Sequence, residues 1–237
     1  FTSHRNIIVD LCQKHGIAAD VHQPGMIDAA KKPSAELDKK AKLWQAQGYN
    51  IDIIGADTLQ HMLGTDVYQH GLLWHEGGQV NPYLFTNGMV TAALNLGAQV
   101  YGDSRVLACE PVGSNWRIRT AQGSVTAGQV VICTSGHTGN AFFPELQNTH
   151  YPLVACGMAT RPLSAELLAA INPSRSVFTQ YPAGLFPIVI DERNRLVTAT
   201  IPGMHNAQNA EKYFAYFLRY LHRTFPITRN ANITMES

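Results

Sequence analysis

The chain has 237 residues, of which 45% are hydrophobic and 15% are charged, and its formal net charge is +1. This length and apolar content allow one large or two small packed cores. Acidic and basic residues are mixed along the sequence, so no basic stripe indicates nucleic-acid binding. The longest uncharged stretches are too polar for a transmembrane helix, and we recognise no signal peptide.

The four cysteines give no sign of a disulfide framework or a metal site. Cys12, Cys109, Cys133 and Cys156 are widely separated, and no two form a Cys-x-x-Cys pair. The ten histidines do not cluster at the short spacings that zinc ligands need. Small buried thiols in a reducing compartment explain this pattern, so we expect a cytoplasmic protein without a bound metal.

The first third of the chain alternates helical and extended patterns. Apolar residues recur at helical spacing before Gly16, which acts as a stop. Pro24-Gly25 predicts a turn between two short strands. The elements expected here are helix Ser3–His15, strands Ala19–Gln23 and Met26–Ala30, helix Ser34–Gln47, a short helix capped by Asp57 and running to Met62, and strand Gly71–His75.

The middle of the chain predicts one helix followed by closely spaced strands. Pro82 suits the first turn of a helix Tyr83–Leu96, which Gly97 ends. The connections at 112–115 and 121–123 are typical of hairpin loops. The expected strands are Gln99–Tyr101, Arg105–Val112, Trp116–Thr120, Ser124–Thr126 and Gln129–Thr134, the last being apolar and β-branched as in a buried parallel strand.

The last third predicts further strands and two helices. These are strand Leu153–Thr160, helix Ala165–Ile171 begun by Ser164, strand Ser176–Gln180, a hairpin of Phe186–Asp191 with Arg195–Thr200, and helix Ala207–Arg223. The whole order indicates an α+β fold with a mixed sheet. We expect helix Tyr83–Leu96 to pack on a sheet that contains Gln129–Thr134, with the strands of 105–126 forming a β-meander beside it.

The sequence lacks the usual dinucleotide-binding fingerprint. That fingerprint is a strand and a Gly-x-Gly-x-x-Gly turn that brings a helix N-terminus to the pyrophosphate, with an acidic residue after the second strand. Gly136-His137-Thr138-Gly139 follows an expected strand but has the wrong spacing. We therefore interpret it as a loop and expect no dinucleotide to bind to this chain alone.

One stretch nevertheless resembles a known family of flavoproteins. A Gly-Gly-x-Val-Asn-Pro entry at Gly77 leads into the predicted helix, then Gly97-Ala98, a Trp-x-Ile-x-Thr…Gly hairpin and the apolar run before Ser135. This order resembles the middle of the FAD-dependent amine and amino-acid oxidoreductases of the D-amino-acid oxidase, glycine oxidase and sarcosine oxidase superfamily. The run VACGMATRPL at Val154–Leu163 is similar to the γ-glutamylputrescine oxidase-like branch.

The resemblance implies a division of the chain into parts of two domains. Residues 1–78 and 141–226 would form a mixed-sheet substrate domain in two parts. Residues 79–140 would form an incomplete FAD/NAD(P)-binding-type α/β domain that carries the β-meander. Residues 227–237 would be a truncated tail, because the resemblance covers nearly all of this chain but only the middle of the family's length.

The resemblance also implies where a flavin cofactor would contact the chain. Val106 matches a strand valine whose backbone groups contact the adenine, although a valine in such a strand is expected in a core in any case. Thr134, Ser135 and Gly136 match a turn at the end of the last parallel strand, where the backbone passes the pyrophosphate and ribitol of FAD. Such a turn is also where ligands sit in open α/β sheets.

Three side chains are candidates for the substrate side: His75, Tyr181 and Phe186. Each has an ordinary alternative, as a satisfied histidine at a strand end or as a core aromatic. The run DERNRLVTAT at Asp191–Thr200 departs from the family, since Ala199-Thr200 replaces two glycines and Ile188-Val189 replaces an aromatic-Arg pair. This departure leaves the identity of the amine or amino-acid substrate open.

The implied activity is oxidation of a C–N bond to an imine, with the flavin as hydride acceptor. The alternative is a flavin-free, catalytically inactive fragment or binding module of the same fold. Val130, Val131 and Ile132 are too apolar to face water as a group. We therefore expect this chain either to bury that surface in a homo-oligomer through strand edges or to leave its FAD-domain part poorly ordered. Because the dinucleotide-binding fingerprint is missing, we also expect this chain alone to be inactive.

Overall fold

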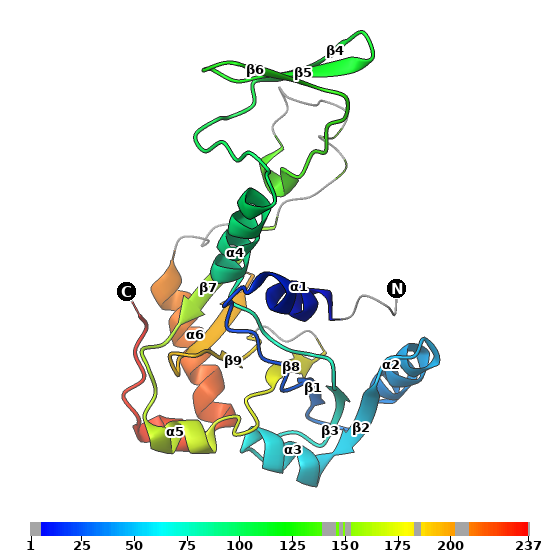
Figure 1. Cartoon of the computed structure of the whole chain (residues 1–237). Helices are drawn as coiled ribbons and strands as arrows, with labels where there is room; N and C mark the ends of the chain where they lie inside the picture. Colours follow the sequence, from blue (N-terminus) through cyan, green and yellow to red (C-terminus); the bar gives the residue numbers. More distant parts are fainter. Residues whose placement is uncertain are drawn as a thin grey trace. The chain divides into compact units, whose positions relative to one another are not determined.

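The computed structural model describes residues 6–138, 146, 149, 153–182, 186–201 and 209–236. The chain divides into two compact units, one made of Phe1–Ala92 with Val154–Ser237 and the other of Ala93–Leu153. We call these the first unit and the second unit. Figure 1 shows the elements of both.

The first unit is built on two short sheets. Strands β2 (Ile51–Gly55), β3 (His70–Trp74), β1 (Met26–Ala30) and β8 (Val177–Tyr181) lie in that order. The β1–β8 pair is parallel and the other two pairs are antiparallel, so this sheet is mixed as expected. The second sheet is antiparallel, in the order β7 (Cys156–Ala159), β10 (Leu196–Thr200), β9 (Val189–Ile190). A bridge between Phe178 and Ile188 joins the two.

The described residues of the first unit contain five whole α-helices: α1 (Ile7–His15), α2 (Ala35–Ala46), α3 (Ala56–Leu63), α5 (Ala165–Ala170) and α6 (Ala210–Thr224). Their ends follow local chemistry. The hydroxyls of Ser34 and Ser164 each accept a hydrogen bond from the backbone amide three residues later, which caps α2 and α5. Gly16 ends α1 in the left-handed conformation. The prediction that Asp57 caps α3 is wrong, because Gly55 holds that position and Asp57 lies in the first turn.

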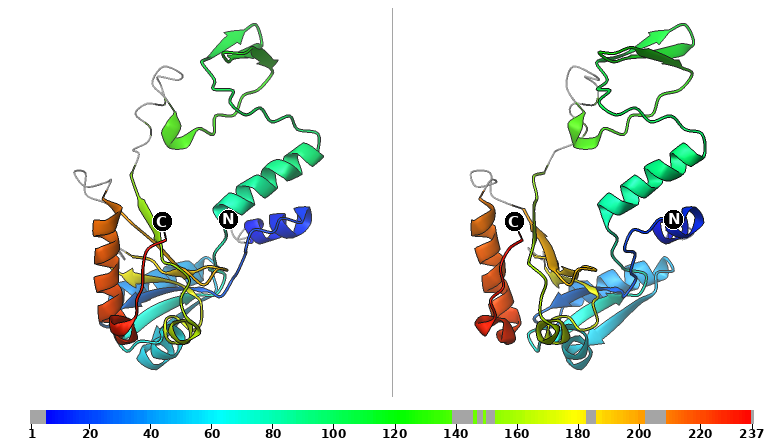
Figure 2. Two further views of the ribbon diagram at one scale, coloured as in Figure 1. Left: turned by 90° about the vertical axis from the view of Figure 1, so that its left-hand side faces the viewer. Right: turned by 60° about the vertical axis from the view of Figure 1, so that its left-hand side comes forward.

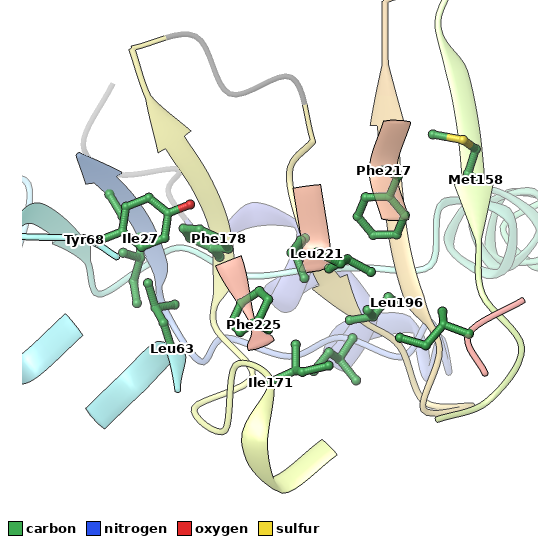
Figure 3. Close-up of a cluster of buried hydrophobic side chains, with 14 of the residues drawn as sticks. Ile27, Leu63, Tyr68, Met158, Ile171, Phe178, Leu196, Phe217, Leu221 and Phe225 are labelled. Carbon is green, nitrogen blue, oxygen red and sulfur yellow. The ribbon is translucent and has the colours of Figure 1, made fainter. Parts of the chain in front are cut away.

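The main core lies between α6 and the sheets. Helix α6 buries Tyr213, Phe214, Phe217 and Leu221 from one face, as its apolar spacing predicts. Figure 3 shows Phe217 and Leu221 in the same buried cluster as Phe178 and Leu196. Figure 2 shows α6 running along one side of the sheets.

A smaller core lies on the opposite face of the mixed sheet. There Leu37 and Ala41 of α2 pack against Ala30, Ile51 and Leu72, and the rings of Trp44, Tyr49, Trp74 and Tyr181 lie around them. Strand alternation separates the two cores, because successive side chains of β1, Ile27 and Asp28, point to opposite faces.

The second unit contains an antiparallel meander of β4 (Ala108–Val112), β5 (Asn115–Arg119) and β6 (Ser124–Ala127). This confirms the predicted β-meander. Helix α4 (Pro82–Asn95) begins in the first unit and ends in the second, where Gly97 adopts a positive φ of 89°. A short 3-10 helix, η2, spans Ser135–His137. Among the described residues of the second unit, none from 93 to 138 is buried.

Several strand predictions are wrong. Residues 129–134 form no strand, and Val131 is 83% exposed, so α4 cannot pack on a sheet that contains them. A parallel strand is held by hydrogen bonds to neighbouring strands, and residues 129–134 have no strand partner in the part of the chain that the structure describes. Residues 99–101 are also not a strand, and 19–23 contribute only a bridge from His22 to Gln79.

Other differences concern element limits. Strand β2 was not predicted, and β4 begins at Ala108 rather than Arg105. The expected starts of α1 and α6 fall partly in residues 1–5 and 202–208, outside the described residues, as does Gly139 of the glycine-containing loop. The chain from residue 226 onward adds a 3-10 helix, η4 (Pro226–Asn230), and a bridge between Thr160 and Met235.

Candidate functional site

A hollow of about 700 Å³ in the second unit brings two predicted cofactor residues together. Val106 and Thr134 both line it, and Ile118 of β5 and residues 130–133 supply most of its apolar wall. We call it the Val106 hollow. Val106 is 36% exposed, so it faces this space rather than a core.

The turn after Thr134 is held by its own hydrogen bonds. The Thr134 and Thr138 hydroxyls lie 2.5 Å apart, and the His137 amide donates to the Thr134 carbonyl at 2.9 Å. Ser135 adopts a positive φ of 45°. Ser135 and Gly136 begin η2, where a helix leaves its first N–H groups without intrahelical partners. Such amides suit an anionic group.

The family resemblance assigns these residues to one part of FAD, and their chemistry is compatible with that assignment. Apolar walls at Val106 and Ile118 suit a flat ring such as adenine, and the amides of the Ser135 turn suit a phosphate. The sequence provides no Gly-x-Gly-x-x-Gly turn to complete a dinucleotide site. The fit therefore covers part of the cofactor only.

The three predicted substrate residues do not come together. The His75 ring nitrogen Nε2 lies 2.8 Å from Asp52 Oδ2, on an exposed strand end. Tyr181 donates its hydroxyl to Glu36 Oε2 at 2.7 Å and packs on the α2 side of the sheet. This hydrogen bond raises the pKa of Tyr181. Phe186 packs into the main core on the other side.

Phe186 lies beside a pair of tyrosines, the buried Tyr68 and the half-buried Tyr220. Its ring centroid is 5.6 Å from that of Phe217 and 5.7 Å from that of Tyr220. The Tyr220 and Tyr68 hydroxyls are 3.2 Å apart, and Tyr68 also donates to Gln180 Oε1 at 3.3 Å. Burial raises the pKa of both tyrosines. Phe186 and these tyrosines therefore form a packed interior cluster.

A second hollow, of about 660 Å³, lies in the first unit and was not predicted from the sequence. Val177, Val189 and Val197, one each from β8, β9 and β10, line it together with the segment 78–84. We call it the valine hollow. The only sequence signal for it was the Gly-Gly-x-Val-Asn-Pro motif, which forms one of its walls.

The two glycines of that motif are required by close backbone approach. A Cβ on Gly77 would lie 2.4 Å from the Met26 Cβ, and one on Gly78 would lie 2.3 Å from the His22 carbonyl oxygen. The absence of side chains lets Gln79 exchange two backbone hydrogen bonds with His22, at 3.0 and 2.8 Å. The motif thus has an architectural explanation.

The rest of the motif places the start of α4. Asn81 Oδ1 accepts a hydrogen bond from the Leu84 amide at 3.2 Å, which caps the helix, and Asn81 Nδ2 donates to Asp20 Oδ2 at 3.2 Å. Gln79 Nε2 donates to the Ile190 carbonyl at 2.9 Å. These contacts fix the wall of the valine hollow against β9.

The described residues contain no group of three or more His, Cys, Asp and Glu side chains that could hold a metal ion. All four cysteines are free. None of the helices in the described ranges is both long and apolar enough to span a membrane.

Comparison with known proteins identifies the family. The family described as FAD dependent oxidoreductase matches residues 2–236. The chain belongs to this family. Gamma-glutamylputrescine oxidoreductase of Escherichia coli (strain K12) is 27% identical over 169 residues, which cover 70% of this chain and 39% of that protein.

Solved structures agree on the fold. Glycine oxidase from Bacillus cereus ATCC 14579 matches with a TM-score of 0.74 at 16% identity, covering 100% of this chain and 64% of that one. Iminodiacetate oxidase from Chelativorans sp. BNC1 matches with a TM-score of 0.72 at 13% identity, covering 99% and 64%. The chain therefore spans less than two thirds of the length of these relatives.

Proposed function

We propose that these residues are part of an FAD-dependent oxidoreductase that oxidises a C–N bond of an amine or amino acid to an imine. The observation that carries the proposal is that Val106 and Thr134, each assigned to the cofactor by family resemblance, line one hollow. Strands β4 to β6 separate Val106 from Thr134 in the sequence, so local chain geometry does not explain why both line the same hollow. The family match over 2–236 supports the same cofactor.

In this proposal the chain binds and orients, and the cofactor supplies the redox chemistry. Bound FAD would accept a hydride from the carbon that carries the amine. Backbone groups of Val106 would hold the adenine, and the amides of Ser135 and Gly136 would hold a phosphate. The substrate domain would comprise 1–78 and 141–226, the partial FAD domain 79–140, and the tail 227–237.

We also propose that these 237 residues are a fragment, inactive and flavin-free by themselves. Two observations support this. The 237 residues cover only 64% of the glycine oxidase chain from Bacillus cereus, and the Val106 hollow would account for only part of a dinucleotide site. The exposed apolar residues near Val131 would then pair with a second copy. A cytoplasmic location, inferred from the cysteine pattern, belongs to the same proposal.

The test uses absorption spectra of two proteins. The longest form that the gene encodes should carry flavin bands and produce an imine-derived aldehyde or keto acid from an amine or amino acid. The 237-residue chain should be colourless. Val106→Asp should lower flavin content in the longer form, whereas Val125→Asp should not, since Val125 is 55% exposed and lies outside the hollow.

Three results would contradict parts of this proposal. A longer form without flavin would favour the binding-module alternative. Equal loss of flavin in both variants would remove the assignment of the Val106 hollow. A yellow, active 237-residue chain would overturn the inactivity of the fragment.

A further inference from the structure

The valine hollow combines an apolar floor with a rim of mixed charge. Val177, Val189 and Val197 are partly exposed side chains on its floor. They come from three strands that lie side by side, so they form a continuous apolar strip. A strip of this kind suits the methylene groups of an unbranched aliphatic chain.

One part of the rim can hold a cation. Asp20 Oδ2 accepts a hydrogen bond from Asn81 Nδ2 at 3.2 Å. The other carboxylate oxygen, Oδ1, has no hydrogen-bond partner among the described residues. Tyr83, which is 74% exposed, lines the same hollow. A carboxylate and an exposed aromatic ring in one hollow suit an ammonium group.

Another part of the rim can hold an anion. The guanidinium of Arg193, at the tip of the β9–β10 turn, forms no ion pair or hydrogen bond with the described residues. Arg195, two residues later, forms ion pairs with Asp191 and Glu236, and both carboxylates raise its pKa. Of the two arginines in the lining, Arg193 is thus the one available to a carboxylate.

The wall of the hollow contains a buried acceptor without a donor among the described residues. Gln79 Nε2 is held by the Ile190 carbonyl, which fixes the amide's orientation, and Gln79 Oε1 is buried without a hydrogen-bond partner among the described residues. Buried acceptors without a donor are uncommon. Because this oxygen is closed to solvent, the amide forms a fixed wall of the hollow.

We propose that the valine hollow binds an unbranched aliphatic ligand that carries an ammonium group at one end and a carboxylate at the other. Asp20 and Tyr83 hold the ammonium, Arg193 holds the carboxylate, and the three valines contact the methylenes. The identification of this ligand with the substrate rests on the proposed function, whereas the binding itself does not.

The binding test needs no flavin and uses the 237-residue chain with 5-aminopentanoate as the probe. Titration by calorimetry or by amide NMR shifts should show binding, with pentylamine and pentanoate each binding more weakly. Lengthening the probe from 3-aminopropanoate should raise the affinity about threefold for each methylene, until the hollow is filled. Absence of binding, or equal binding of the three five-carbon probes, would overturn the proposal.

Matched variants assign the rim residues. Arg193→Gln and Asp20→Asn should each weaken binding about threefold to tenfold, because each removes one exposed charge. Asparagine tolerates the positive φ of 49° at position 20, so the fold should be kept. The controls are Arg223→Gln and Asp10→Asn, which remove exposed charges outside the hollow. Equal weakening in the controls would contradict the assignment.

A kinetic arm separates this inference from the proposed function. In the longer form, Arg193→Gln should raise KM for a substrate with a carboxylate and leave kcat nearly unchanged. Binding without any flavin-dependent turnover would overturn the proposed function and leave the site standing. Turnover with an unchanged KM in Arg193→Gln would overturn the hollow as the substrate site.

Discussion

The hydroxyl groups of Tyr68 and Tyr220 face each other at 3.2 Å inside the main core of the first unit. Burial is the largest cause that raises the pKa of each, and for Tyr220 the neighbouring Tyr68 raises it further. In the unfolded chain both tyrosine hydroxyls ionise near pH 10, whereas in the folded chain Tyr68 and Tyr220 still hold their protons at that pH. Stability is therefore full below about pH 10 and should fall as the pH rises above it.

Urea unfolding between pH 8 and pH 11 measures this slope. Tyr68→Phe and Tyr220→Phe should each flatten it, because phenylalanine has no proton to lose. Tyr83→Phe serves as the control, since Tyr83 is 74% exposed. If the buried and exposed variants gave the same slope, the pair would not be responsible for the pH dependence.

The stability of the first unit should depend strongly on Phe217. This side chain is fully buried and contacts Phe186, Phe214 and Tyr220. Phe217→Ala leaves a cavity and should cost about 3–5 kcal/mol in the free energy of unfolding. Leu43→Ala is the control, because Leu43 is 59% exposed and should change stability by less than about 0.5 kcal/mol. Similar losses in both would contradict the central place of α6 in the core.

Local signals in the sequence predicted local structure well. Ser34 and Ser164 cap helices because their hydroxyls reach an amide only three residues away. The apolar face of α6 followed from its helical spacing. Residues 129–134 show the limit of this reasoning: their composition suits a parallel strand, but whether a strand forms depends on neighbours elsewhere in the chain.

The candidate site shows the same limit. A period of two places Tyr181 and Phe178 on opposite faces of a strand, but it does not say which core covers each face. Tyr181 and Phe186 are close in sequence and yet pack on different sides of the sheet. The valine hollow was missed because each of its valines, taken alone, is an ordinary strand residue.

A buried carboxylate connects α2 to the mixed sheet. Asp28 Oδ2 accepts hydrogen bonds from Lys40 Nζ at 2.7 Å and from Trp74 Nε1 at 3.1 Å, and its side chain is only 7% exposed. Lys40→Ala should cost about 1–3 kcal/mol, because the carboxylate loses its counter-charge. Adding Asp28→Asn should recover part of that loss, since an amide needs no counter-charge and still accepts from Trp74.

Chemical denaturation of the single and double variants tests this pair. Lys42→Ala is the matched control, because Lys42 is exposed on the same helix. If Asp28→Asn made Lys40→Ala still less stable, the charge on Asp28 would not be the reason for the loss.

The last prediction concerns the apolar surface of the second unit. None of its described residues from 93 to 138 is buried, and Leu107, Val125 and Val131 are 49%, 55% and 83% exposed. Exposed apolar side chains favour association, and the outer edges of β4 and β6, which have no strand partner among the described residues, offer backbone groups for it. We therefore expect the 237-residue chain to be at least a dimer in size-exclusion chromatography with light scattering. Val131→Lys should shift it toward the monomer, because a charge on that surface cannot be buried without a partner. Leu43→Lys, on the exposed face of α2, should leave the mass unchanged. A wild-type chain that stays monomeric at high concentration would show that this surface does not associate with a second copy.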